Sequence, residues 1–148
     1  GQTVIAGTKS GLIKASAKLK SLGAKRIIEL LVSAPFHSAL MKPVAEKLAE
    51  VLAKISFKDA RFPIISNVNG QAETKGEALK ELLLLQVASP VRFTDCVHYV
   101  QKNYKNERYL ELGPKNVLCG LTKKIHEQAI LLNADTKEDF LKLRGLNE

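Results

Sequence analysis

The residues best suited to chemistry lie in the segment Val32–Pro43, whose sequence is VSAPFHSALMKP. His37 stands there after a predicted strand and just before a predicted helix. In open α/β sheets, catalytic groups gather at the carboxyl ends of strands. An imidazole at such a place can take a proton from a hydroxyl group near neutral pH. A histidine that caps the helix or packs in the core is the structural alternative, and position alone leaves both interpretations open.

The other histidines and the two cysteines give weaker signals. His98 falls within a predicted helix, so a surface or packing position is expected for it, and His126 follows two lysines near a helix end, where a cation suits the helix dipole. Cys96 and Cys119 occur in a chain whose first residues show no secretion signal, which favours a reducing, cytoplasmic location. Scattered histidines and two cysteines do not form the clustered ligand set that zinc requires, so no metal site is predicted.

The elements that must position these residues alternate along the chain between β-rich runs and helical periodicity. Strands are predicted at 3–6, 26–32, 62–68, 108–112 and 129–132, and helices at 9–22, 38–54, 77–88, 95–104 and 116–125, followed by a terminal helix. This alternation predicts an α/β protein with a largely parallel sheet.

Four residues mark the expected ends of these helices. Gly23 suits the C-terminal cap of the first helix, and Pro43 is compatible with a helix only in its first turn. Thr94 is a plausible N-cap for the helix at 95–104, and Asp135 for the terminal helix.

Length and composition limit the class of protein. A chain of 148 residues is the size of one domain, and 45% hydrophobic with 26% charged residues is typical of a globular protein rather than a disordered one. No apolar stretch approaches the roughly 18 residues of a membrane-spanning helix, so no membrane association is predicted. A domain boundary is suggested near residues 33–35, where a proline and a change in charge coincide.

The net charge of +8 is concentrated at the start of the chain. Residues 1–33 hold six basic side chains and one acidic one, a balance of +5. A basic lobe attracts phosphorylated ligands, acidic proteins or nucleic acid. Nucleic acid is disfavoured, because no basic cluster is interleaved with aromatic residues and no binding motif occurs. A non-catalytic basic module that binds an acidic protein or a phosphorylated ligand therefore stands as an alternative to an enzyme.

Five segments carry a resemblance to a known family. They are GQTVIAG at 1–7, GAKR at 23–26, PFHSALM at 35–41, QVASPVRFT at 86–94 and ELGPKNVLCGLTK at 111–123. In order and spacing, over about residues 1–133, they resemble the malonyl-CoA:acyl carrier protein transacylases of bacterial fatty acid synthesis. One departure is Lys115, where the family often has a second glycine after Gly-Pro.

The resemblance implies a two-step acyl transfer by an enzyme. His37 matches the family's general base, which activates a serine that takes the malonyl group from malonyl-CoA and passes it to the phosphopantetheine thiol of acyl carrier protein. Gln86 matches the residue whose main-chain carbonyl orients that histidine, so the identity of its side chain matters less. Without the resemblance, Gln86 is an ordinary polar residue at a helix end.

The resemblance also implies the ligands and partners. No cofactor is bound permanently, and malonyl-CoA is the substrate. Phe36, beside the histidine, matches a position that affects acyl choice, and its bulk weakly favours a small acyl group. Lys123 and Lys124 are either a solvated basic face or part of the surface that binds the acidic carrier protein.

The nucleophile of the family lies in a G-x-S-x-G turn, which this sequence does not contain. Ser10 in GTKSG has the wrong spacing, and Ser33 and Ser38, which flank His37, are not such serines. The chain is therefore expected to be the C-terminal half of the enzyme, with the N-terminal half of the same enzyme as its partner, and inactive by itself.

The family fold is an α/β-hydrolase-like subdomain with a ferredoxin-like subdomain inserted in it. By this resemblance, residues 1–33 are part of the small subdomain, and residues 34–148 are the C-terminal part of the large one. Sheets without their neighbouring strands leave exposed edges. The polypeptide is therefore expected to be unstable as an isolated monomer.

Overall fold

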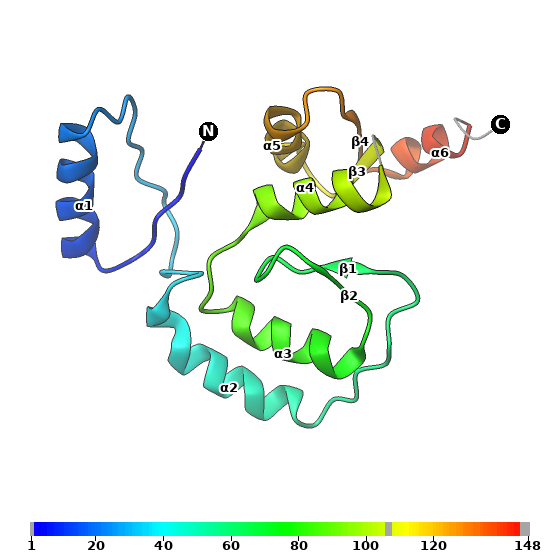
Figure 1. Ribbon diagram of the computed structural model, residues 1–148, viewed down its shortest axis with the longest axis horizontal. Coiled ribbons are helices and arrows are strands. Elements are labelled where there is room, and N and C mark those ends of the chain that lie inside the picture. The colour runs from blue at the N-terminus through cyan, green and yellow to red at the C-terminus, as the bar shows by residue number, and fades with distance from the viewer. Residues whose placement is uncertain (1, 106–107, 146–148) are drawn as a thin grey trace. The chain divides into compact units, whose positions relative to one another are not determined.

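The computed structural model describes residues 2–105 and 108–145, which form an α/β chain of helices and short strands (Figure 1). The chain divides into two compact units, residues 1–92 and residues 93–148. The boundary expected near residue 33 separates two subdomains of the family fold and does not coincide with this division, so it stays a prediction. Gly1, the first residue of the GQTVIAG motif, lies outside the described residues.

The predicted first helix is present as α1 (Lys9–Ser21). The side chain of Thr8 caps it, because its Oγ1 accepts a hydrogen bond from the N–H of Gly11 at 3.1 Å. Gly23 follows the last turn with a φ of +90°, a conformation that glycine adopts without steric cost. The predicted glycine end of this helix is thus confirmed.

The strands predicted at 3–6 and 26–32 are wrong for the described chain. Both segments are irregular and exposed, and Leu31 has a relative exposure of 101%. A β-strand exists through pairing, and neither segment pairs with another strand within the described residues. Local β propensity therefore produced no strand here.

The predicted second helix begins as a short 3-10 turn, η1 (Ala39–Met41), and continues as α2 (Lys42–Leu52). Pro43 lies in the first turn of α2, as predicted. α2 packs against α3 (Gly76–Gln86), and Met41 and Leu52 are among the few buried apolar residues. α2 thus begins shortly after His37, and α3, its packing partner, ends at Gln86.

The strand predicted at 62–68 is reduced to β1 (Ile64–Ile65), which pairs with β2 (Ala72–Glu73) in antiparallel register. A turn at residues 66–70 ends β1 early. The Oγ of Ser66 accepts a hydrogen bond from the N–H of Val68 at 3.2 Å, and the carbonyl of Ser66 accepts one from the N–H of Gly70 at 2.8 Å. The sheet is thus not largely parallel in this part of the chain.

Residues 93–148 have the predicted β-α-β order with a parallel pair. α4 (Phe93–Tyr104) precedes β3 (Arg108–Leu112), α5 (Val117–Ile125) crosses over to β4 (Ile130–Ala134), and α6 (Lys137–Gly145) follows. β3 and β4 pair in parallel from Arg108↔Ile130 to Leu112↔Ala134. α5 packs on both strands, as a crossover helix does.

Two of the predicted helix caps are wrong. α4 begins at Phe93, so Thr94 lies inside its first turn. The terminal helix is capped by Thr136 rather than Asp135, because Thr136 Oγ1 accepts from the N–H of Asp139 at 3.2 Å. Asp139 Oδ2 accepts in return from the N–H of Thr136 at 3.0 Å. This reciprocal pair satisfies two donors at once, which an isolated Asp135 does not do.

Both cysteines are free; Cys96 is buried, whereas Cys119 is half-buried. Burial raises the pKa of the Cys96 thiol, which disfavours the reactive thiolate. Among the helices of the described chain, none combines the length and the apolar character needed to cross a membrane. Within the same residues, no three His, Cys, Asp or Glu side chains gather closely enough to hold a metal ion.

Candidate active site

His37 lies in a tight turn directly before η1. Its φ of +59° is in the left-handed region, which residues other than glycine rarely adopt. Such strained conformations are frequent at functional sites. The turn is closed by the Oγ of Ser38, which donates to the carbonyl of Pro35 at 2.7 Å. The N–H of Met41 donates to the carbonyl of Ser38 at 3.0 Å and starts the helix. Ser38 thus shapes the turn that presents the imidazole.

The Nδ1 atom of His37 lies 3.0 Å from the carbonyl oxygen of Gln86, 49 residues further along the chain. A carbonyl oxygen can only accept a hydrogen bond, so Nδ1 must carry the proton. In the neutral ring, this assignment leaves Nε2 as the proton acceptor. The two residues that the family resemblance singled out are therefore brought together, while their catalytic roles stay predictions.

Gln86 is the last residue of α3, and this position explains why its carbonyl is available. The final carbonyls of a helix lack an N–H partner in the next turn and must find one elsewhere. The Gln86 carbonyl finds the imidazole of His37. The end of α3 therefore contributes directly to the site.

Asn67, which the sequence interpretation did not single out, contacts the same helix end. Its Nδ2 donates to Oε1 of Gln86 at 3.3 Å, and its carbonyl accepts from the N–H of Arg92 at 2.8 Å. The Asn-x-Asn-Gly turn that contains it is visible in the sequence, but the residues it bonds are 19 and 25 positions away. Local pattern therefore gave no sign of this contact.

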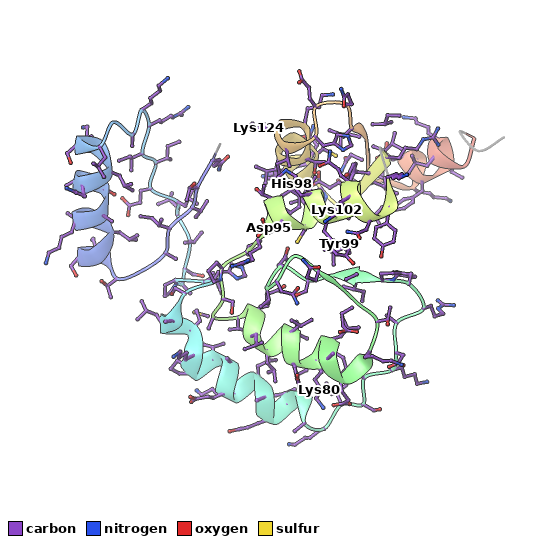
Figure 2. The ribbon with its side chains drawn as sticks, viewed as in Figure 1. Lys80, Asp95, His98, Tyr99, Lys102 and Lys124 are labelled. Carbon is purple, nitrogen blue, oxygen red and sulfur yellow. The ribbon has the colours of Figure 1, made fainter. Side chains whose placement is uncertain are left out.

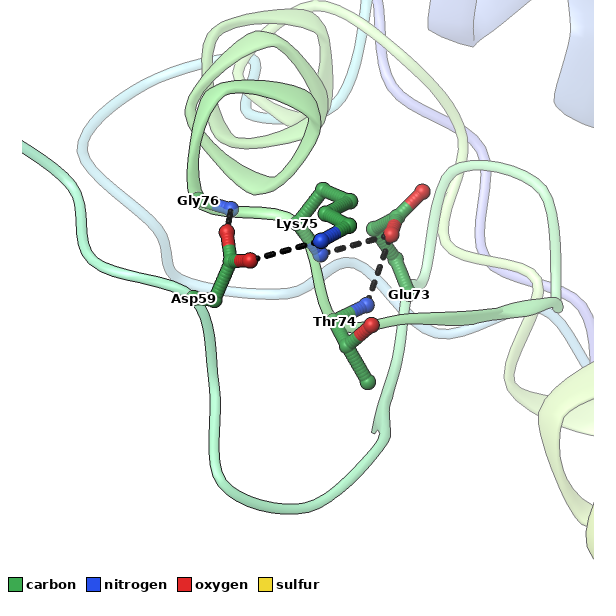
Figure 3. A network of polar contacts seen from close by, with 5 residues as sticks. All are labelled: Asp59, Glu73, Thr74, Lys75 and Gly76. Atoms are coloured by element: carbon green, nitrogen blue, oxygen red, sulfur yellow. Dashed lines mark hydrogen bonds and ion pairs between the residues drawn. The ribbon is translucent and has the colours of Figure 1, made fainter.

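The N-terminus of α3 is held by a polar network (Figure 3). Asp59 Oδ1 accepts from the N–H of Gly76 at 2.9 Å, and its Oδ2 accepts from Nζ of Lys75 at 2.8 Å. Glu73 Oε1 accepts from the N–H groups of Thr74 and Lys75 at 2.6 and 2.7 Å. The hydrogen bond from the Lys75 side chain, and after it that from the N–H of Gly76, lowers the pKa of Asp59. The pKa of Glu73 is lowered as well, chiefly by the hydrogen bond from the N–H of Lys75. Donors at a helix start favour nearby carboxylates.

The remaining predicted residues divide between the site and the rest of the chain. Phe36 is half exposed beside His37. His98 is exposed on α4, and Lys124 lies on α5 (Figure 2). His126 is buried, and its Nδ1 lies 3.3 Å from the hydroxyl of Tyr109, so it is a packing histidine.

The ELGP motif has a structural role in its own unit. Glu111, in β3, accepts hydrogen bonds from the N–H groups of Cys119 at 2.8 Å and Leu118 at 3.1 Å, in the first turn of α5. These donors, that of Cys119 above all, lower the pKa of Glu111. Lys115, which follows Gly113-Pro114, adopts a φ of +71°, a conformation that glycine would take without strain.

Replacing Glu111 with Gln is expected to weaken the first turn of α5 at neutral pH. A carboxylate whose pKa is lower in the folded state stabilises the fold above its unfolded value of 4.5, and that stabilisation is lost as pH falls through the lower folded value. The protection of the first-turn amides of α5 from exchange should therefore be lower in the variant than in the original protein at pH 7, and the two proteins should become alike at acid pH. Amide hydrogen exchange at Leu118 and Cys119, corrected for intrinsic rates, measures the difference. Glu127→Gln, which removes an exposed carboxylate beyond α5, is the control and should leave this protection unchanged.

An imidazole oriented by a main-chain carbonyl, in a turn that leads into a helix, is the arrangement expected of an acyl-transfer base. The comparisons with known proteins point to that class, since the proteins matched are acyltransferases by name. No protein-family model matches the chain. The matched sequences and structures nevertheless name a single activity.

Two curated relatives are malonyl CoA-acyl carrier protein transacylases. That of Staphylococcus aureus (strain MSSA476) is 39% identical over 148 residues, which are 100% of this chain and 47% of that protein. That of Escherichia coli (strain K12) is 46% identical over 125 residues, which are 84% of this chain and 40% of that protein. A malonyl-transacylase solved in complex with a type II PKS acyl-carrier protein superposes with a TM-score of 0.86 at 38% identity, covering 94% of this chain and 45% of the other.

The chain is therefore a homologue of the malonyl CoA-acyl carrier protein transacylases, and the resemblance predicted from its motifs is confirmed. It spans about half the length of the curated relatives it matches. The α/β class of the fold is confirmed as well.

Proposed function

We propose that this chain is the base-bearing part of a malonyl transferase of fatty acid synthesis, with His37 as general base and the main-chain carbonyl of Gln86 as its orienting partner. The observation that carries the proposal is the 3.0 Å contact between His37 Nδ1 and the Gln86 carbonyl oxygen. It supports the proposal because it leaves Nε2 free to accept a proton. The homologues named above make the same activity the best supported one.

The chemistry follows from the imidazole and from a serine supplied by a segment outside this chain. Nε2 takes the serine proton while the serine oxygen attacks the malonyl thioester carbonyl. The C–S bond then breaks, and the coenzyme A thiolate takes the proton from the imidazolium. The phosphopantetheine thiol of acyl carrier protein next attacks the seryl ester, with His37 as base again, and the malonyl thioester and the free serine result. Atoms and protons balance over the two steps, and no bound cofactor is needed.

The uncharged partner of His37 fits this double role. A carbonyl fixes the tautomer and the direction of the ring without adding a negative charge beside it. The ring can therefore act as a base toward the serine or the thiol and as an acid toward the leaving group. The position of His37 in a strained left-handed turn supports the same role, since such strain concentrates at functional sites.

We also propose that the partner of this chain is the N-terminal half of the same enzyme. The α/β-hydrolase-like and ferredoxin-like assignment, with residues 1–33 in the small subdomain and 34–148 in the large one, belongs to this proposal. Large apolar side chains that are exposed in the described structure support it, among them Leu22, Leu31 and Phe62. A stable monomer does not leave so much apolar surface uncovered.

The substrate and partner assignments rest on the same homology. Malonyl-CoA and acyl carrier protein are the proposed reactants, and the exposed basic residues of α1 suit an anionic partner. Phe36, half exposed beside His37, is proposed to favour a small acyl group by its bulk. A cytoplasmic location stays a prediction from the free thiols.

The experiment compares this chain with the complete enzyme that carries an upstream half. Malonyl transfer from malonyl-CoA to acyl carrier protein should be present in the complete enzyme and absent from this chain alone, because the nucleophilic serine is missing. Mass spectrometry of the acyl carrier protein measures the product directly. Transfer by the isolated chain at the rate of the complete enzyme would overturn the proposal.

A further inference from the structure

The orientation of the Gln86 carbonyl is set at a place where helices are weakest. Gln86 ends α3, and Val87 already lies beyond the helix. The last turn has few internal hydrogen bonds, and helix ends fray for this reason. The carbonyl that must meet Nδ1 of His37 therefore needs an anchor from outside α3.

Asn67 is that anchor. Its side chain bonds Oε1 of Gln86 at 3.3 Å, and its main-chain carbonyl bonds the N–H of Arg92 at 2.8 Å. One residue thus holds both ends of the segment that leaves α3, residues 86–92. The peptide plane of Gln86 is fixed from its own side chain and from the far end of the segment.

Asn67 is itself held firmly, so it can act as an anchor. It follows Ser66, which is buried, and whose N–H donates to the carbonyl of Gln71 at 2.9 Å. The turn closes through the N–H of Gly70, which donates to Ser66, and Gly70 has the φ of +67° that such a turn requires. The strand pair β1–β2 thereby supplies a fixed point beside the end of α3.

We infer that Asn67 is a positioning residue of the site: through the Gln86 side chain, it holds the Gln86 carbonyl toward Nδ1 of His37. The Gln86 side chain then has a role as well, because it links the orienting carbonyl of Gln86 to Asn67. The catalytic consequence of the inference rests on the proposed function, whereas the effect on the imidazole does not.

The test uses the complete enzyme and reads the His37 ring directly. Asn67→Leu keeps the size of the side chain and removes its hydrogen-bonding groups. ¹⁵N NMR of the imidazole, at a pH where the ring is neutral, should show the Nδ1–H tautomer in the original protein. It should show a shift toward Nε2–H in Asn67→Leu. kcat should fall roughly tenfold with KM for malonyl-CoA unchanged, because only the alignment of the base is altered.

Three variants separate positioning from a general loss of structure. Asn67→Asp should recover the tautomer and most of kcat, because the Gln86 amide can turn and donate to the new carboxylate. Gln86→Met removes the same bond from the other side, and its effect should not add to that of Asn67→Leu. Asn69→Leu breaks a bond inside the same turn, where Asn69 Oδ1 accepts from the N–H of Gln71 at 3.0 Å, and it should leave the tautomer unchanged.

An unchanged His37 tautomer in both Asn67→Leu and Gln86→Met would overturn the inference. So would an Asn69→Leu variant that shifts the tautomer as much as Asn67→Leu, since the turn as a whole would then be responsible. If the complete enzyme transfers no malonyl group, the proposed function fails, and the tautomer measurements still decide the role of Asn67.

Discussion

Replacing His37 with Ala in the complete enzyme is expected to lower malonyl transfer by roughly 10²–10⁴-fold, the usual contribution of a general base. The reason is that Nε2 is the group left to accept the serine proton once Nδ1 is committed to the Gln86 carbonyl. Both half-reactions use the same imidazole, so formation of the malonyl-serine ester and its transfer to acyl carrier protein should both slow. Single-turnover measurements of each half-reaction test this expectation.

A second variant protects this experiment from an effect on folding. His37→Asn places an amide N–H near the position of Nδ1, and asparagine tolerates the left-handed turn that His37 occupies. This variant should keep the bond to Gln86 and the structure of the turn, yet remain as inactive as His37→Ala because it lacks a base. His98→Ala, at an exposed position on α4, is the matched control and should retain full activity. Full activity of His37→Asn would remove His37 from the mechanism.

Gly76→Ala is expected to destabilise the protein, although alanine is the better helix former. A Cβ at position 76 would overlap the carbonyl oxygen of Phe57, and it would lie 2.7 Å from the carbonyl carbon of Phe57 and 2.9 Å from that of Lys58. These are main-chain atoms, which cannot turn aside. The gain in helix propensity is at most about 1 kcal/mol, while overpacking a filled site costs about 1–3 kcal/mol. The clash also displaces the N–H of Gly76 from Asp59, so the net effect is a loss.

The same substitution at Gly120 is the control, because the described residues leave nothing within 4 Å of a Cβ there. Gly120→Ala lies inside α5 and should be neutral or stabilising by up to about 1 kcal/mol. Denaturant unfolding of the complete enzyme, carrying either substitution, compares the two changes in the free energy of unfolding. Equal effects would show that packing against Phe57 does not limit position 76.

The described structure explains which local predictions succeeded. Two helices follow from periodicity and end signals that are local in sequence: α1, with Gly23 after it, and α2, with Pro43 in its first turn. The β3-α5-β4 unit was predictable for a related reason. Its two strands are joined by one helix and pair with each other, so the partner of each strand is close in sequence.

The predictions that failed depended on partners elsewhere. Residues 26–32 have the composition of a strand but remain irregular, because β propensity acts only where a neighbouring strand accepts its hydrogen bonds. The strand predicted at 62–68 was cut to two residues by the side chain of Ser66 and the turn that it closes. Asp135 lost the capping role to Thr136, which the carboxylate of Asp139 supports.

For the site, the sequence by itself determined which residue is the candidate base and, through the resemblance of five motifs, which kind of enzyme to expect. Only the tertiary structure decided how that base is held. It placed the Gln86 carbonyl 3.0 Å from the imidazole of His37, anchored Gln86 to Asn67, and set α3 on Asp59 at its other end. These contacts join residues between 17 and 49 positions apart. No local sequence pattern predicts a hydrogen bond over such a separation, because the bond depends on where folding places its donor and its acceptor.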